Sequence, residues 1–414
     1  MWRSTAKRRN RWRTVVWVVA FVVVLLGSAF AAYTYGRSQS PAALGKQDRK
    51  SLALYAQALK TVQDNYVDRK AIDPKKQTYG AIKGMLNTLG DEGHTRFLTP
   101  EEREQDHKSL SGTYEGVGIE IQNKGGKVVV VAPIEGTPAD RAGIKPGDVV
   151  VAVDGKNVRG EGVSGAIKEI KGPKGTDVKL TVVRGGEERV FDLKRAEIET
   201  PVASWAMIPG SNVAQVSLAL FSNDSAQKLK QAFEEARAAG ARRFILDLRD
   251  DPGGRLEQAV EMAGDFLQPG SVVYIRENAS GDREKIEAKG GAEFADAPMA
   301  VLVNGGTASS SEILAGALRD NNRAPVIGET TFGTGTVLSE FDLSDGSAIL
   351  LGVAEWLTPD GDSIRKTGIV PNIKVPLAKG AEPLSPDQTR GLSKEEILKK
   401  DAQLRRAFEE LQGR

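Results

Sequence analysis

The spacing of apolar residues predicts two amphipathic helices near the start of the chain. In the first, apolar side chains recur every three or four residues, at Leu52, Tyr55, Ala56, Leu59 and Val62. That spacing places them on one face of a helix. The second has the same pattern in TYGAIKGMLNTLGD, where Gly90 marks the expected helix end. We therefore expect a small helical region here.

From about Ser111 the pattern changes to short β-rich runs separated by glycine, proline and aspartate. The runs are GVGIEIQ, KVVVVAPI, DVVVAVDG, VKLTVVRGG and ERVFDLK. Two helical pieces interrupt them, near TPADRAG and GVSGAIKEIKG. Several short strands at such close spacing predict a small β-rich domain, which ends near Glu199.

Beyond that point strand and helix patterns alternate. Expected strands are VAQVSLAL, FILDLR, SVVYIRE, MAVLVN and APVIGE, and helices include DSAQKLKQAFEEARAAG and RLEQAVEMAGDFL. This order predicts a largely parallel sheet with crossover helices. Sites in such sheets form at the C-terminal ends of strands, where LRDDPGG and NGGTASSS lie. The tail SKEEILKKDAQLRRAFEELQ predicts one helix with a capping box formed by Ser393 and Glu396.

The N-terminus predicts a membrane anchor. Residues 15–33 carry no charge, and their number is close to the ~20 that a spanning helix needs. Lysine and arginine residues precede this run, which keeps the N-terminus in the cytoplasm and places the rest outside it. The alternative is a cleaved signal peptide, because Ala29 and Ala31 offer a small-x-small site. Both alternatives export the remainder of the chain, to a bacterial periplasm or the cell exterior.

Composition removes several kinds of chemistry. The chain has no cysteine, which excludes disulfides, thiolate catalysis and cysteine-bound metal. Its only histidines are His94 and His107, so a multi-histidine metal site is excluded as well. The net charge of +2 gives no case for a nucleic-acid partner. No metal or cofactor is implied.

The stretch VLVNGGTASSSEILAGALRD places four hydroxyls between an expected strand and an expected helix. They are those of Thr307, Ser309, Ser310 and Ser311. Gly305 and Gly306 permit a sharp turn before them. A serine at a helix N-terminus meets backbone N–H groups and a dipole that favour an alkoxide or an oxyanion. The alternative is helix capping, by Ser309 with Glu312 or by Thr307 or Ser310.

Several motifs in order resemble the carboxyl-terminal processing peptidases, also called tail-specific proteases. They are LGDEGHTRFLTPEE, GVGIEI, PIEGTPADRAGIKPGDVVVAVDG, ILDLRDDPGG, LVNGGTASSSEILAGALRDNNRAPVIGETTFGTG and LTPDGDSIRKTGIVPNI. The resemblance runs from about Leu52 to Pro376. It implies an α/β fold in which a PDZ-like domain precedes a crotonase-like serine-peptidase core.

The resemblance also implies roles for single residues. The family nucleophile matches Ser309, and the oxyanion donors would be the N–H groups of Ser310 and of Gly253 or Gly254. A carboxylate-binding loop matches Gly116, Val117, Gly118 and Ile119. Its backbone N–H groups would receive a peptide C-terminus, and the adjacent strand would add the peptide by β-augmentation. The alternative for that loop is an ordinary hairpin start.

The chain departs from the family at the general base. The family uses a serine–lysine dyad, in which a desolvated lysine activates the serine. Here Thr334 occupies the lysine position, and Leu338 occupies that of a supporting glutamine. Thr334 cannot act as a base at neutral pH, and Leu338 offers no hydrogen bond to orient one.

Other residues are candidates for a replacement base. His94 lies in the GHTRFL motif, where we expect a structural role, and His107 lies in a charged, solvated run. The family carries Glu312 alongside the lysine, so it is not a replacement. The sequence does not fix where Lys366 points. One of Asp250 and Asp251, which stand where the family usually has asparagines, would be a carboxylate base near Ser309.

The predicted organisation has six parts. They are a cytoplasmic tail (1–13), an anchor or signal (14–36), a helical region (37–110), a PDZ-like domain (111–198), a serine-peptidase core (199–380) and a C-terminal helical tail (381–414). Two functions remain open from the sequence. One is a membrane-anchored serine endopeptidase acting on C-terminal tails of exported proteins. The other is a degenerate relative that binds peptide C-termini as an adaptor or regulator, for example of an active paralogue. A homo-oligomer is a further possible partner state.

Overall fold

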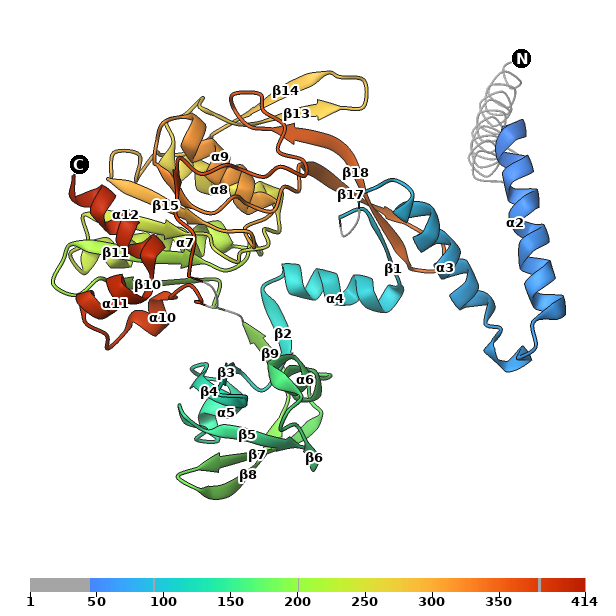
Figure 1. The fold of residues 1–414 in the computed structure, drawn as a ribbon, viewed down its shortest axis with the longest axis horizontal. Coiled ribbons are helices and arrows are strands. Elements are labelled where there is room, and N and C mark those ends of the chain that lie inside the picture. Colours follow the sequence, from blue (N-terminus) through green and yellow to red (C-terminus); the bar gives the residue numbers. More distant parts are fainter. Residues whose placement is uncertain (1–44, 92–93, 200, 379–380, 414) are drawn as a thin grey trace, which may run out of the picture. The chain divides into compact units, whose positions relative to one another are not determined.

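The computed structural model describes residues 45–91, 94–199, 201–378 and 381–413 (Figure 1). The predicted anchor, residues 15–33, lies outside these ranges. Within them, no helix is both long enough and apolar enough to cross a bilayer. The chain divides into two compact units, Met1–Ala81 and Ile82–Arg414.

The first described elements include the two helices expected from the apolar spacing, α2 (Lys46–Asn65) and α3 (Pro74–Asn87). A short 3₁₀ helix, η2 (Arg69–Ala71), lies between them. None of the α2 side chains is buried. Gly90 follows α3 with a φ of 67°, a left-handed conformation that suits glycine at a helix end.

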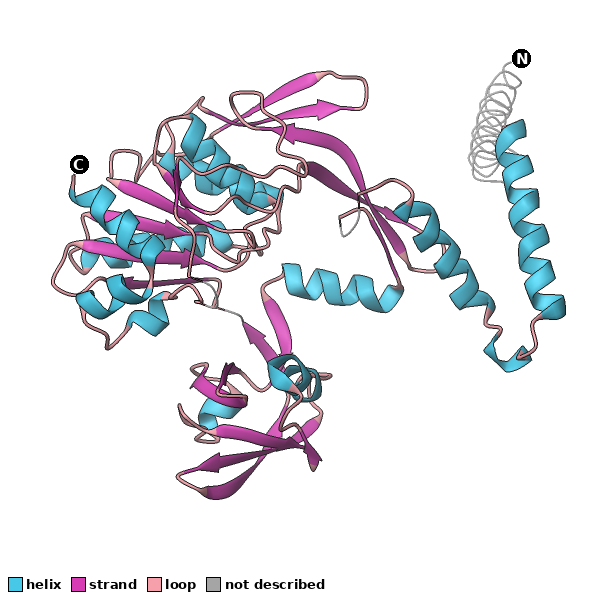
Figure 2. Cartoon of the chain, in the orientation of Figure 1, coloured by secondary structure: helices cyan, strands magenta, loops and turns pink. Residues whose placement is uncertain are grey.

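The β-rich segment forms an antiparallel sheet of the order β3-β4-β5-β7-β8, with β6 paired to β5 (Figure 2). Its strands are β3 (Ile119–Lys124), β4 (Lys127–Pro133), β5 (Val149–Val153), β6 (Lys156–Asn157), β7 (Asp177–Arg184) and β8 (Glu187–Lys194). The helices α5 (Pro138–Arg141) and α6 (Gly162–Ile170) contribute Ala139 and Ala166 to its apolar core. Before and after this sheet, β2 (Thr113–Gly116) and β9 (Ala196–Glu199) pair with each other.

The predicted parallel sheet is present. Its order is β10 (Ala203–Met207), β11 (Val213–Leu218), β12 (Arg243–Asp247), β15 (Met299–Val303), β16 (Val326–Gly328) and β19 (Ile373–Lys374). All neighbouring pairs are parallel except β10 with β11. Because β12 and β15 are neighbours, the loops that follow their C-terminal ends meet at one edge of the sheet.

Helices cover both faces of this sheet. On one face α7 (Ser225–Ala238), α8 (Leu256–Phe266) and α9 (Ser310–Asp320) pack in the same apolar cluster as Phe244 and Leu246 of β12. On the other face Leu404 and Leu411 of the tail pack with Ile245. Successive side chains of a strand point to opposite faces, so one strand serves both cores.

The strand prediction was wrong in one respect. The segment SVVYIRE forms β13 (Val272–Asn278), which lies outside the parallel sheet. It joins a separate antiparallel sheet with β1 (Arg96–Leu98), β14 (Arg283–Glu287), β17 (Thr336–Asp342) and β18 (Ala348–Leu357). The helix α4 (Pro100–Leu110) follows β1 and is held by a capping box of Thr99 and Glu102.

The tail prediction was also wrong in one respect. The segment SKEEILKKDAQLRRAFEELQ forms two helices, α11 (Lys394–Lys400) and α12 (Ala402–Gln412), rather than one, and the short helix α10 (Pro386–Thr389) precedes them. The capping box of Ser393 and Glu396 is confirmed at the start of α11. The break falls at Asp401, whose backbone is extended and whose carboxylate accepts the N–H groups of Gln403 and Leu404.

Candidate active site

Ser309 ends the turn between β15 and α9 in a strained conformation. Its φ of 56° and ψ of −120° lie outside the regions that residues with a Cβ normally adopt. Such a conformation costs about 1–3 kcal/mol and persists only where the surroundings enforce it. Gly305 and Gly306 were expected to permit a sharp turn. In the structure, Gly306 is needed because a neighbouring residue lies very close to it. A methyl group on Gly306 would lie 2.6 Å from Asp250 Oδ1, so this glycine permits a close approach.

The other three hydroxyls of the turn have structural partners. Thr307 Oγ1 donates to the Leu248 carbonyl at 2.7 Å. Ser310 Oγ donates to the Gly254 carbonyl at 2.9 Å, and Ser311 Oγ donates to the Asp251 carbonyl at 3.1 Å. These bonds fasten the turn to the loop after β12. The N-cap of α9 is Ser309, so capping by Thr307 or Ser310 is wrong.

The loop after β12, residues 248–254 (LRDDPGG), is called the glycine loop here. It lies directly against the turn that contains Ser309. A methyl group on Gly253 would be 2.8 Å from both Ser309 Cβ and Ser310 N, so only glycine fits there. The N–H of Gly253 donates to Asp251 Oδ1 at 2.9 Å. Within the described residues, the N–H groups of Gly254 and Ser310 have no such acceptor. The loop and the start of α9 thus each bring one unoccupied donor to the neighbourhood of Ser309.

Thr334 lies beside Ser309, as the resemblance implies for the lysine position. Its buried hydroxyl accepts the Ser309 N–H at 3.0 Å. Buried Glu312 holds both residues, accepting the Ser309 N–H at 2.9 Å and the Thr334 N–H at 3.0 Å. It also accepts the Gly333 N–H at 2.7 Å and the Thr331 hydroxyl at 2.5 Å. Glu312 therefore holds the backbone of the site in place, because these hydrogen bonds come from backbone N–H groups and from the Thr331 hydroxyl.

Three of the candidate bases are engaged or exposed. Asp250 is exposed, and its Oδ1 accepts a hydrogen bond from Asn304 Nδ2 at 2.9 Å. His107 pairs with Glu340 at 2.8 Å on the second sheet. Lys366 is exposed, although its N–H donates to the Gly333 carbonyl at 2.8 Å. Among the described residues, none of these three side chains is hydrogen-bonded to Ser309.

Leu338 lies in β17 opposite Gly352 of β18, next to an irregularity in the strand pairing. Its side chain is half-buried. An apolar side chain donates no hydrogen bond, so this position supplies nothing to orient a base.

His94 lies closer to the site than the sequence suggested. Its Nδ1 is hydrogen-bonded to Thr336 Oγ1, two residues beyond Thr334. Burial lowers the pKa of His94 from its usual 6.5, although the nearby Asp91 carboxylate opposes that shift. The imidazole is therefore neutral at pH 7. The two partners are 242 positions apart in the sequence, and no local pattern links them.

Asp251 is fully buried beneath the glycine loop. Burial raises the pKa of its carboxyl to about 8, against the lowering effect of the Gly253 N–H. Its Oδ2 is buried without a hydrogen-bond partner among the described residues. A carboxyl with such a pKa is mostly protonated at pH 7, which argues against the predicted role as a carboxylate base.

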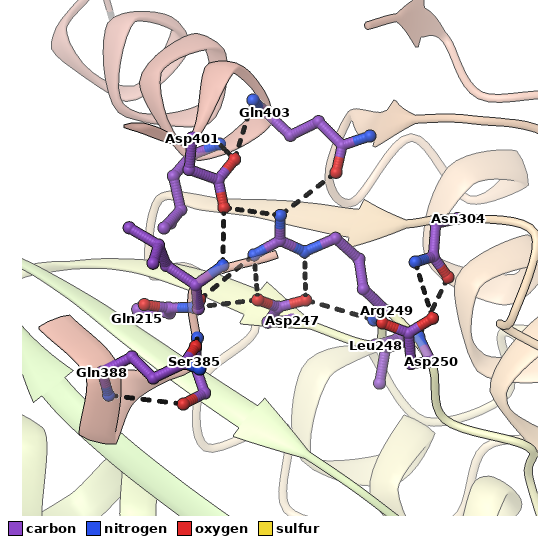
Figure 3. Close-up of polar contacts among 12 residues, drawn as sticks. Gln215, Asp247, Leu248, Arg249, Asp250, Asn304, Ser385, Gln388, Asp401 and Gln403 are labelled. Carbon is purple, nitrogen blue, oxygen red and sulfur yellow. Dashed lines mark hydrogen bonds and ion pairs between the residues drawn. The ribbon is translucent and has the colours of Figure 1, made fainter. Parts of the chain in front are cut away.

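A buried ion-pair network is formed at the start of the glycine loop, around Arg249 (Figure 3). Arg249 Nη2 lies 2.6 Å from Asp247 Oδ2, and Arg249 Nη1 lies 2.8 Å from Asp401 Oδ2. Gln403 Oε1 accepts from the same guanidinium at 3.1 Å, and Gln215 Nε2 donates to Asp247 at 2.8 Å. Since Arg249 immediately precedes Asp250, the C-terminal tail is tied to the chain at the start of this loop.

The expected carboxylate-binding loop lies between β2 and β3. Gly118 has a φ of 81°, and a methyl group there would lie 2.3 Å from Thr137 Cβ. The Gly118 carbonyl accepts the Ile134 N–H at 3.0 Å, and the Val117 carbonyl accepts the Ala139 N–H at 2.9 Å. Ile119 begins β3, an edge strand of its sheet, with α6 alongside. β-augmentation requires an edge strand with free backbone groups, and β3 is an edge strand.

Comparisons with known proteins agree with this architecture. Residues 212–375 match the model of peptidase family S41, and residues 129–184 match that of a PDZ domain. The carboxy-terminal processing protease CtpA of Bacillus subtilis (strain 168) is 35% identical over 364 residues, which cover 87% of this chain and 76% of that protein. A CtpA-like serine protease of Staphylococcus aureus (strain COL) is 34% identical over 372 residues, covering 89% and 74%.

Solved structures include similar folds. An S41 protease from Bacteroides fragilis NCTC 9343 has a TM-score of 0.52 at 16% identity, covering 82% of this chain and 94% of that one. At that identity the likeness concerns the fold alone. The photosystem II D1 C-terminal processing protease is 32% identical, with a TM-score of 0.47, and covers 78% of this chain and 92% of that one.

Proposed function

Because this chain belongs to peptidase family S41 and, within it, to the carboxy-terminal processing serine proteases, we propose that it cleaves exported proteins near their C-terminal tails. Ser309 is the nucleophile in this proposal. The N–H groups of Gly254 and Ser310 stabilise the oxyanion, and the PDZ domain binds the substrate C-terminus through residues 116–119. The export signal or anchor would lie in residues 14–36.

The conformation of Ser309 carries this proposal. A serine that only caps a helix adopts an ordinary extended backbone, as Ser385 and Ser393 do in this chain. Ser309 is instead held at a φ of 56° by two acceptors for its N–H, Thr334 Oγ1 and Glu312 Oε2. Backbone strain of this kind concentrates at functional sites, because it presents a side chain that relaxed backbone would turn away.

We propose that His94 takes the place of the missing lysine. Thr334 and Thr336 are two residues apart, so their Cα atoms are separated by at most about 7 Å. The serine is bonded to the first threonine and the histidine to the second. His94 is thus linked to Ser309 through two neighbouring threonines, and the proposal requires that its ring reach Ser309 Oγ directly or through one water in the substrate complex.

The steps of the reaction follow from these positions. The neutral imidazole of His94 takes the hydroxyl proton as Ser309 Oγ attacks the scissile carbonyl carbon. The carbonyl oxygen becomes an oxyanion, which accepts hydrogen bonds from Gly254 and Ser310. Collapse of this intermediate breaks the C–N bond, and the imidazolium returns the proton to the leaving amine. A water, deprotonated by the same imidazole, then attacks the acyl carbon. The ester C–O bond breaks, the imidazolium returns the proton to Ser309 Oγ, and the new carboxyl terminus leaves.

The test uses the purified chain from about Arg37 onward with an unfolded protein that has an apolar C-terminus. Cleavage is expected for the wild type and not for Ser309→Ala. His94→Ala should lose about 10²–10⁴-fold in rate, the usual contribution of a general base. His107→Ala is the matched control and should cleave as the wild type does.

Each outcome of this test has a distinct meaning. Undiminished cleavage by His94→Ala would reject the histidine base while leaving Ser309 as the nucleophile. No cleavage by the wild type, with a C-terminal peptide still bound, would reject the peptidase and favour a peptide-binding adaptor.

A further inference from the structure

Asp251 contacts both halves of the proposed site. Its carboxyl accepts the Gly253 N–H at 2.9 Å. Its backbone carbonyl accepts the Ala308 N–H at 3.0 Å and the Ser311 hydroxyl at 3.1 Å. The same residue thus fixes the glycine loop with its side chain and the nucleophile turn with its main chain.

The carboxyl of Asp251 lies where an ionised group is poorly tolerated. The residue is fully buried, and Oδ2 has no partner among the described residues. The nearest cation along the loop is engaged elsewhere, since Arg249 pairs with Asp247 and Asp401. A negative charge on Asp251 would therefore be poorly compensated, and burial raises its pKa to about 8.

The carboxyl groups of Glu312 and Asp250, elsewhere in the site, have hydrogen-bond partners of their own. Glu312, on α9, accepts its bonds from Ser309 and from residues 331–334. Asp250, the preceding residue, is turned to Asn304. An ionised Asp251 would therefore add a charge beneath the loop whose N–H groups receive the oxyanion, and it would oppose formation of that oxyanion.

We propose that Asp251 is a positioning residue that works as an uncharged acid. By holding the Gly253 N–H, it sets the loop so that the Gly254 N–H, together with that of Ser310, faces the substrate oxygen. This inference rests on the proposed function, and it assigns the oxyanion donor to Gly254 rather than to Gly253.

The experiment compares the wild type with Asp251→Asn and Asp251→Ala, measuring kcat/KM between pH 5.5 and 9.5. Asparagine offers the same acceptor oxygen to Gly253 and never ionises. We expect the kcat/KM of the wild type to fall about tenfold per pH unit above pH 8, because the active form is the protonated one. Asp251→Asn should retain the neutral-pH activity and lose this decline. Asp251→Ala should be at least about tenfold slower at every pH, because the Gly253 N–H loses its hydrogen-bond acceptor.

A second measurement does not depend on activity. The folded-state pKa of Asp251 is raised above its ordinary 3.8, so the folded protein retains a proton that the unfolded chain releases. The stability of the wild type relative to Asp251→Asn should therefore be highest at low pH and fall as the pH rises from about 4 to about 8. Thermal melts of both proteins at several pH values measure this difference.

The two measurements separate the possible failures. An alkaline decline that persists unchanged in Asp251→Asn overturns the inference, as does a melting difference that is independent of pH. An Asp251→Ala variant as active as Asp251→Asn would also overturn the positioning role. A wild type inactive at every pH would reject the proposed function instead, and the melts would then decide whether Asp251 is uncharged.

Discussion

Replacing Asp401 with asparagine should destabilise the peptidase core strongly, although the residue belongs to the C-terminal tail. The Arg249 side chain is almost completely buried between Asp247 and Asp401, at 2.6 and 2.8 Å. Asp401 also accepts the Leu384 N–H at 3.1 Å. The substituted asparagine would lack the charge that Arg249 needs, in a place where water cannot replace it.

The expected magnitude follows from two separate contributions. Breaking a buried ion pair by removing one partner costs about 3–5 kcal/mol. Asp247 still faces the guanidinium, which puts the loss for Asp401→Asn near the lower limit, about 3 kcal/mol. Asparagine remains a good N-cap for α12, so the cap bonds to Gln403 and Leu404 survive. Asp401→Ala loses them too and should cost about 1 kcal/mol more.

Urea unfolding followed by tryptophan fluorescence is the assay. Beyond residue 17 the chain has only Trp205 and Trp356, and both lie in the peptidase core, so the signal does not report on the PDZ domain. Asp387→Asn is the matched control, because Asp387 forms an exposed pair with Arg390 at 3.2 Å. Exposed pairs contribute about 0–1 kcal/mol. A loss for Asp401→Asn no larger than for this control would refute the reasoning.

Three further predictions concern the site and the PDZ domain. Thr334→Lys with Leu338→Gln should restore cleavage to a His94→Ala protein, because it rebuilds the family dyad. If the rates stay at the His94→Ala level, other parts of the site have diverged from the family as well. Gly253→Ala should lower kcat/KM at least about 10²-fold, because its methyl group would collide with Ser309 and Ser310. Wild-type rates would show that the loop can shift to make room for the methyl group. Gly118→Ala should weaken binding of a C-terminal peptide, measured by fluorescence anisotropy, while cleavage of a short peptide that bypasses the PDZ domain stays unchanged.

The sequence was informative wherever function depended on local pattern and on strand order. The parallel core and the positions of both loops followed from alternating strands and helices. Since Asp247 of β12 pairs with Leu302 of β15, the loops after them meet as expected. The placement of Ser309, Gly253 and Thr334 in one neighbourhood was also anticipated, although from the resemblance rather than from periodicity.

The features that the sequence did not reveal depend on contacts between distant residues. The break at Asp401 exists because its carboxylate binds Arg249, 152 positions away, and a helix pattern carries no sign of that partner. Similarly, β13 reads as another strand of the parallel sheet, but it pairs with β18, which no pattern of its own specifies. His94 was expected to be structural because it lies in the GHTRFL motif, and no pattern in the sequence pointed to its hydrogen bond with Thr336.

The substitution at position 334 does more than remove a base. The Thr334 hydroxyl accepts the N–H of Ser309 at 3.0 Å. Together with Glu312 it provides two acceptors for one N–H, and this excess holds the serine in a conformation that the backbone disfavours. A site that had simply lost its lysine would have no need of such an acceptor. In this chain, the Thr334 hydroxyl therefore helps to hold the backbone of Ser309, and in our proposal the proton transfer that Thr334 does not perform is assigned to His94.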